Sequence, residues 1–269
     1  MRLYLSSSLC WAYPLPDVIK LAKLFHFDGV EVWAEHVWHY QTSVNSILHA
    51  KEEYNIELSL HAASWDLNIS AINEGIRKQS IQEIENSMML AKQLEATNVT
   101  IHPGRRTLAN QWLDKHEQLL IENLQMLAYK AEQLNVTLSI EQMEAIKKEF
   151  ITSPKPLNGL LEQLPDSIQT TFDIAHVPLS ESPEAYFHQI NRINKIHISD
   201  ATHQIYHVPL GTGLVKLDPI LRILRDTDLP VVVEGFESNR SLSMLQQNVN
   251  YLDHKNLRRR ENVENLSYE

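Results

Sequence analysis

Short apolar segments alternate with longer amphipathic segments along the whole chain. In the amphipathic segments, such as Ile84–Leu94 and Leu119–Leu134, apolar residues recur every three or four positions, which predicts helices. Ser182 followed by Pro183 is typical of a helix start. Most of the short segments are continuous apolar runs, as expected for parallel strands buried on both faces. The predicted strands are Leu3–Ser7, Gly29–Trp33, Glu57–His61, Val99–His102, Val136–Glu141, Ile168–Asp173, Ile193–Ser199 and Val231–Glu234.

Eight strand-then-helix units predict an α/β fold of one domain, a closed (β/α)8 TIM barrel spanning residues 1–269. An open doubly wound sheet is the alternative. It is disfavoured because no glycine-rich phosphate-binding motif follows the first strand. From about His254 the chain is polar and charged, and we expect Lys255 and Arg258–Arg260 to belong to a solvated tail.

Composition narrows the class of protein. The chain has 269 residues, 43% of them hydrophobic, which is enough for one barrel. Its net charge of −10 argues against nucleic-acid binding as the main function but does not exclude a local basic patch. Cys10 is the single cysteine, so no intrachain disulfide can form, which fits a reducing, cytoplasmic location. Residues 1–17 are interpreted as a strand and loop rather than a signal peptide, and no apolar run approaches the ~18 residues of a membrane span.

Ionisable side chains fall at the ends of the third to eighth predicted strands. Because strand ends converge on one mouth of a barrel, where active sites lie, we expect these side chains to meet. Taken singly, such a histidine more often caps a loop, and such a carboxylate is often only the first solvated residue. Six ionisable side chains at neighbouring strand ends would be costly to bury together without a cation. The residues are His61, His102, Glu141, Asp173, His197 and Glu234, with His176 and Asp200 close by in the sequence.

These residue types also indicate the kind of metal. A mixed set of imidazoles and carboxylates without cysteine suits Zn²⁺, Mn²⁺, Co²⁺ or Fe²⁺ better than Mg²⁺ or Ca²⁺. The sequence therefore predicts a divalent metal cofactor at the mouth, with the identity and the number of ions left open.

The order and spacing of several short motifs resemble those of the xylose isomerase-like TIM-barrel superfamily, over nearly the whole chain. That superfamily contains sugar isomerases and epimerases, and endonuclease IV-type enzymes. The motifs are Gly-Val-Glu31-Val-Trp, His61 with Asp66-Leu67-Asn68, Ile-His102-Pro-Gly, Ile-Glu141-Gln, Phe-Asp173-Ile-Ala-His176, Ile-His197-Ile-Ser-Asp200, His207-Val-Pro-Leu-Gly-Thr-Gly213 and Val-Glu234-Gly.

The isomerase and epimerase branch implies one metal held by four residues, namely Glu141, Asp173, His197 and Glu234. The resemblance then implies that Glu141 and Glu234 remove and return a proton next to a carbonyl, while the metal stabilises the enediolate charge. His176 would contact a substrate oxygen. His203 stands where many such epimerases carry an arginine after the strand-seven histidine.

The endonuclease branch implies three zinc ions. His61, His102 and Glu141 would hold one, and the four residues named above another. His176 and His207 would hold the third together with an aspartate two positions before His207, but Ile205 stands there and cannot ligate a metal. His61 and His102 also allow a dinuclear site or extra substrate contacts.

The remaining candidates concern the substrate. Arg105 and Arg106 are positioned to bind a phosphate, although a solvated loop is the more ordinary role. Trp11 and Trp65 are candidates for the wall of a sugar pocket. Residues 36–39 are interpreted as a surface loop, and Glu31 as a group that orients a metal ligand.

The leading hypothesis is a metal-dependent isomerase or epimerase with a small carbohydrate substrate, with assembly into a homo-oligomer left open. The alternatives are an endonuclease IV-like phosphodiesterase and a non-catalytic metal- or sugar-binding barrel.

Overall fold

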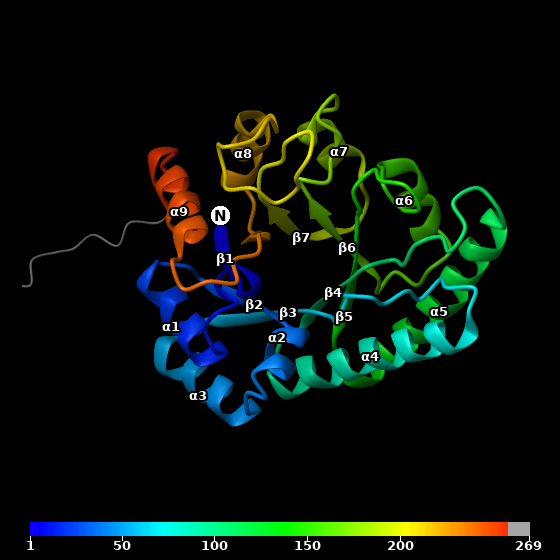
Figure 1. The fold of residues 1–269 in the computed structure, drawn as a ribbon, viewed down its shortest axis with the longest axis horizontal. Coiled ribbons are helices and arrows are strands. Elements are labelled where there is room, and N and C mark those ends of the chain that lie inside the picture. The colour runs from blue at the N-terminus through cyan, green and yellow to red at the C-terminus, as the bar shows by residue number, and fades with distance from the viewer. Residues whose placement is uncertain (258–269) are drawn as a thin grey trace, which may run out of the picture.

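The strands close into a barrel. In the computed structural model, which describes residues 1–257, all neighbouring strands are parallel, and β1 pairs with β8. This confirms the predicted (β/α)8 architecture (Figure 1). The strands are β1 (Arg2–Ser6), β2 (Gly29–Trp33), β3 (Glu57–His61), β4 (Asn98–Ile101), β5 (Thr137–Glu141), β6 (Gln169–Asp173), β7 (Ile193–Ile198) and β8 (Pro230–Val233).

Helices surround the barrel and cover the outer face of its strands (Figure 1). The Oγ atom of Ser182 accepts a hydrogen bond from the Ala185 amide, which confirms the helix start predicted there. None of the helices within residues 1–257 is both long enough and apolar enough to cross a bilayer. The helices are α1 (Leu15–Leu24), α2 (Ala34–His39), α3 (Val44–Tyr54), α4 (Glu74–Gln93), α5 (Leu113–Leu134), α6 (Pro154–Leu161), α7 (Pro183–Gln189), α8 (Leu217–Arg225) and α9 (Ser243–His254).

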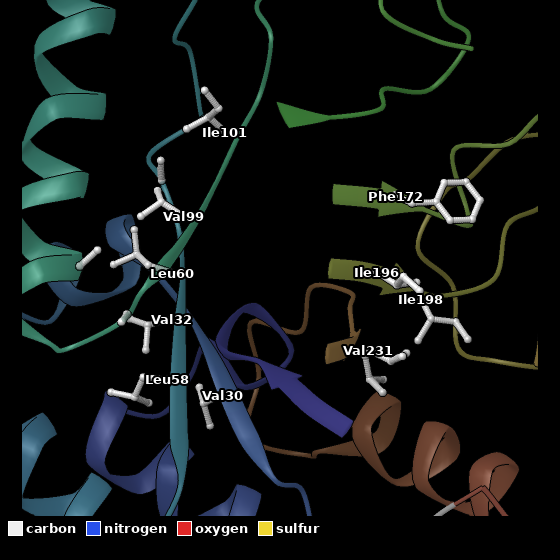
Figure 2. Packing of buried hydrophobic residues seen from close by; sticks show 14 of the residues in the cluster. Val30, Val32, Leu58, Leu60, Val99, Ile101, Phe172, Ile196, Ile198 and Val231 are labelled. Atoms are coloured by element: carbon white, nitrogen blue, oxygen red, sulfur yellow. The ribbon is translucent and has the colours of Figure 1, made fainter. Parts of the chain in front are cut away.

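The two faces of the strands differ in polarity, which corrects the expectation of uniformly apolar strands. In β3, Leu58 and Leu60 belong to the hydrophobic core that the helices cover (Figure 2). Residues that alternate with them point into the barrel, because successive side chains of a strand face opposite ways. Thr100 on β4 and Thr171 on β6 share a hydrogen bond of 2.8 Å across the interior. The inner face can be polar because its groups hydrogen-bond one another.

A register shift between β6 and β7 determines which side chains of β7 point into the barrel. Thr170 pairs with Ile193, but Thr171 pairs with Lys195, so Asn194 is an extra residue on this strand. Because the side-chain period of a strand is two, one inserted residue exchanges its inward and outward faces. As a result His197, rather than an isoleucine, lies level with Asp173 of β6.

Two local expectations change at the edges of the fold. The segment from residue 36 to 39 is part of helix α2 rather than a surface loop, and the His36 side chain is fully buried with its Nε2 2.9 Å from the Tyr13 carbonyl oxygen. At the other end of the chain, Lys255 pairs with Asp218 at 2.6 Å. The predicted basic group at residues 258–260 lies outside the described residues.

Candidate active site

Four buried side chains meet at the C-terminal mouth of the barrel. Glu141 and Asp173 end β5 and β6, His197 lies near the end of β7, and Glu234 directly follows β8. One ligand atom from each lies within 4.8 Å of the others. The Nδ1 atom of His197 is 3.6 Å from Glu141 Oε1, 3.9 Å from Asp173 Oδ2 and 3.0 Å from Glu234 Oε2. The structure therefore brings together the four residues that the resemblance implied.

His197 lies between Glu31 and this cluster. Burial lowers its pKa, but the carboxylates of Glu234, Glu31 and Glu141 raise it well above its usual value. The Nε2 atom of His197 lies 2.8 Å from Oε1 of the buried Glu31. Glu31 also pairs with Lys195 across the barrel. Burial raises the pKa of Glu31, but Lys195 and His197 together hold it well below its usual range. Glu31 is thus an anion that holds the orientation of the His197 ring.

Four buried polar atoms of these residues lack a hydrogen-bond partner: Asp173 Oδ2, Glu234 Oε2 and both ring nitrogens of His197, which lie 2.8 Å and 3.0 Å from carboxylate oxygens as ion pairs. Buried polar atoms are rarely left unpaired in this way, and each such atom has a cost. Two carboxylate oxygens and one imidazole nitrogen that converge form a donor set for a divalent transition metal. The residues present therefore fit such an ion.

The environment shifts the acidity of the carboxyls in the cluster. Burial raises the pKa of Asp173 to about 6, against the attraction of His176 and His207. Burial also acts to raise the pKa of Glu234, but the nearby His197 lowers it to about 2. The two carboxyls differ because Glu234 lies closer to the imidazole that stabilises its charge.

A second group of possible ligands shares Glu141. The Nε2 atoms of His61 and His102 lie 3.3 Å and 3.4 Å from Glu141 Oε2. The His61 Nδ1 atom donates to the Ala62 carbonyl oxygen at 2.8 Å, and its Nε2 hydrogen-bonds Glu141 Oε2 at 3.3 Å. Trp33 stacks on the His61 ring with centroids 4.1 Å apart and holds it in place.

A third group consists of Asp173, His176 and His207. His176 donates from Nδ1 to the Gln142 carbonyl oxygen at 2.8 Å, and its Nε2 lies 3.1 Å from Nε2 of His207. Burial lowers the pKa of His176, but the charges of Asp173 and of the glutamates beside it raise it to about 9. Ile205, at the position where the endonuclease pattern requires an aspartate, is 60% exposed.

Five of the candidate ligands line a cavity of about 350 Å³, which we call the reaction cavity: His102, Glu141, His176, His207 and Glu234. Both Glu141 and Glu234 line it, and Trp33, Trp65 and Phe236 form an aromatic wall. An adjoining cavity of about 530 Å³, the outer cavity, shares Trp33, Trp65 and His102 with it and also contains Arg105. A small polar molecule can therefore lie against the carboxylates with room to extend outward.

The other predicted contacts have different positions. Trp65 lines both cavities, whereas the Trp11 side chain is largely buried and packs on Trp65 with ring centroids 4.9 Å apart. His203 is exposed on the loop after β7 and is not among the residues that line the two cavities. Asp200 accepts hydrogen bonds from the backbone amides of Ala201, Gly211, Gly213 and Val215, so it organises that loop.

Sequence reasoning missed two charged residues of the site. Glu144 lies in the loop after β5, with its Oε2 atom 3.6 Å from His176 Nε2. Lys195 lies two residues before His197, where the alternation of a strand places it on the same inner face. That spacing was a usable signal for Lys195. Glu144 lies in the loop after the strand, where no periodicity of the sequence predicts which way its side chain points.

A parallel eight-stranded barrel with histidines and carboxylates at its C-terminal mouth defines a TIM-barrel protein whose mouth carries side chains of the types that bind metals. The sequence profile described as "Xylose isomerase-like TIM barrel" matches residues 19–255, and the chain belongs to that family. A relative in Methanocaldococcus jannaschii, the uncharacterized protein MJ1188, is 24% identical over 230 residues, which is 84% of either chain.

Solved structures share the fold. A D-tagatose 3-epimerase-like protein superposes with a TM-score of 0.77 at 19% identity, covering 95% of this chain and 99% of that one. A 3-keto-D-glucoside 4-epimerase from E. coli gives 0.79 at 16% identity, covering 94% and 98%. A probable 3-DHS dehydratase from Bacillus anthracis gives 0.75 at 17% identity, covering 94% and 99%. At these identities the likeness establishes the fold.

Proposed function

We propose that the chain is a divalent-metal-dependent isomerase or epimerase that acts on a small ketose or a related carbonyl compound. The observation that carries the proposal is the placement of Glu141 and Glu234. Both carboxylates are buried, both belong to one set of metal-capable side chains, and both line the reaction cavity from separate strands. Two of the folds that superpose on this chain are named as epimerases or epimerase-like.

The carboxylates supply the proton transfer. One of Glu141 and Glu234 takes the proton from the carbon next to the carbonyl, and a carboxylic acid returns a proton to that carbon or to its neighbour. No electron is gained or lost overall. A bound divalent ion would contribute positive charge beside the substrate oxygens, which stabilises the negative charge created by proton removal.

The neighbouring side chains orient the substrate. His176, whose ring is fixed by the Gln142 carbonyl oxygen, presents Nε2 to the reaction cavity and can hydrogen-bond a substrate oxygen. Trp33 and Trp65 offer apolar faces on which the carbon-bearing side of a sugar can pack. Enclosure by these rings also limits the access of water to the deprotonated substrate.

The test is solvent deuterium exchange into ketoses at the carbon next to the carbonyl, with metal-loaded protein. We expect Glu141→Gln and Glu234→Gln to slow exchange by at least about 10³-fold, because a neutral amide neither accepts nor returns the proton. Metal content must be measured in each variant, so that loss of the ion is separated from loss of the base.

The matched control is Glu57→Gln, which makes the same change at the far, N-terminal end of β3. This variant should exchange like the wild type. Unchanged exchange in Glu141→Gln would remove that residue from the mechanism.

A second function is favoured by one specific observation. The set of four possible ligands shares Glu141 with the set of His61 and His102 and shares Asp173 with the set of His176 and His207, as a multinuclear phosphodiesterase site of the endonuclease IV kind would require. The exposed Ile205 weakens the third set. Incubation of the Zn²⁺-loaded protein with a duplex containing an abasic site decides between the two functions. Strand cleavage that disappears in His102→Ala would place the phosphodiesterase first.

A further inference from the structure

A third hollow continues outward from the two cavities of the mouth. Its volume is about 370 Å³, and it shares Asp66 and Arg105 with the outer cavity. Its other charged residues are Arg106 and Lys148. Because the outer cavity in turn shares His102 with the reaction cavity, an elongated molecule can reach from the glutamates to this basic hollow.

The basic hollow is positively charged in a protein whose net charge is −10. Three cationic side chains and one carboxylate, that of Asp66, line it. Within residues 1–257, neither Arg105, Arg106 nor Lys148 is engaged in an ion pair. The Arg106 guanidinium lies over the Phe150 ring, 5.3 Å from its centroid, which restricts its motion.

The backbone that carries these cations is held from two sides. Asn68 accepts from the Arg105 amide at 3.0 Å and donates to the Arg105 carbonyl oxygen at 2.8 Å. Ser70 donates to the same carbonyl oxygen at 2.9 Å. The Arg106 amide donates to the Lys148 carbonyl oxygen at 2.9 Å, which joins the loop after β4 to the loop after β5. The basic side chains therefore start from a fixed frame.

We propose that the basic hollow binds the phosphate of a phosphorylated substrate whose carbonyl end lies between Glu141 and Glu234. The inference rests on the proposed function and narrows its substrate class from free sugars to sugar phosphates. A phosphate monoester carries about −1.5 to −2 charges at pH 7, which the excess of two positive charges in the hollow balances. Arginine also matches the oxygens of a phosphate in a bidentate arrangement.

Two acidic residues line the outer cavity: Asp66, which also lines the basic hollow, and Glu149. Glu149 lines the outer cavity, where burial and the nearby Glu144 raise its pKa to about 7. A carboxyl that is partly protonated near neutral pH repels a passing anion less than an ordinary carboxylate does. The sugar hydroxyls, rather than the phosphate, would lie beside it.

Calorimetric titration of the metal-loaded protein with D-fructose and with D-fructose 6-phosphate tests the proposal. We expect the phosphate ester to bind at least about tenfold more tightly, since hydrogen bonds between a phosphate and cationic side chains are stronger than those between neutral groups. The double variant Arg105→Ala/Lys148→Ala should lose this preference and keep the affinity for D-fructose. The control Lys147→Ala, an exposed neighbour outside the lining of the hollow, should keep the preference.

Two results would overturn the proposal: no preference in the wild type, or a preference that survives in the double variant and so belongs to the metal centre. Failure of the proposed function is a separate result. If neither ligand exchanges deuterium although the preference follows Arg105 and Lys148, the basic hollow stands and the isomerase proposal fails. If exchange occurs without a phosphate preference, the reverse holds.

Discussion

The barrel buries charge in two places, and it neutralises them differently. In the middle of the barrel, Glu31 and Lys195 form an ion pair, with both side chains almost fully buried. At the mouth, Glu141, Asp173 and Glu234 gather with no lysine or arginine among them, and two of their oxygens lack a hydrogen-bond partner. Buried charges are retained when they are paired or coordinate a metal. A lysine thus neutralises Glu31 inside the barrel, whereas imidazoles face the carboxylates at the mouth, where the divalent ion of the proposed function would add positive charge.

Removal of the internal cation gives the largest expected effect. Lys195→Met leaves the Glu31 carboxylate buried without its partner, and breaking a buried pair typically costs about 3–5 kcal/mol. Urea unfolding of the metal-free protein measures this loss. The double variant Lys195→Met/Glu31→Gln should regain part of it. The control Lys130→Met breaks a surface pair of 3.8 Å with Glu85 and should cost less than about 1 kcal/mol.

His36 gives a comparison with the histidines of the mouth, because it is buried without a carboxylate partner. Burial lowers the pKa of His36 to about 4. The histidines of the unfolded chain titrate near pH 6.5. Between pH 6.5 and 4, the unfolded chain therefore binds a proton at His36, whereas the folded chain does not. The stability from this residue is thus present above pH 6.5 and is lost as the pH falls towards 4.

Replacement by a neutral residue removes this titration. His36→Gln should make the free energy of unfolding less dependent on pH across that interval, by on the order of 3 kcal/mol relative to the wild type. Urea titrations at pH 7, 6, 5 and 4 measure the difference. Parallel curves for the two proteins would show that His36 titrates normally in the folded state.

Glu31 links the two buried clusters, because it contacts both Lys195 and His197. Loss of a group that orients a metal ligand commonly lowers metal affinity about 10- to 100-fold. We expect this for Glu31→Gln, measured as the dissociation constant of Mn²⁺. The exposed Glu57→Gln variant should bind Mn²⁺ like the wild type. If Glu31→Gln bound Mn²⁺ as tightly as the wild type, the orientation of His197 toward the ion would not depend on Glu31.

The sequence predicted the fold and the ends of the strands because both follow from local periodicity. Glu141, Asp173, His197 and Glu234 come directly after or near the end of apolar runs, and a closed barrel brings strand ends together. Loop geometry carries no such signal. His203 lies on a loop held by Asp200 and is exposed, whereas Glu144 reaches His176 from a loop that no pattern places.

The polar inside of the barrel was missed for a different reason. Segments such as Leu58–His61 already alternate apolar and polar residues in the sequence, so this signal was available and was not used. What one strand alone does not show is which polar residues of other strands its own will meet, as with Thr100 and Thr171. The bulge at Asn194 is also a property of pairing between strands, so the inward direction of His197 depends on β6 as well as on the sequence of β7 itself.

The central claim is that the mouth of this barrel is a divalent metal site. Protein stripped with EDTA should bind at least one Mn²⁺ or Zn²⁺ per chain in a calorimetric titration. Its melting temperature should rise with the free metal concentration, since ~1,000-fold excess over the dissociation constant adds about 4 kcal/mol of stability. Asp173→Asn, which removes one charge from the buried cluster, should weaken both effects sharply. Absence of binding to the wild type, or equal binding by Asp173→Asn, would contradict the account.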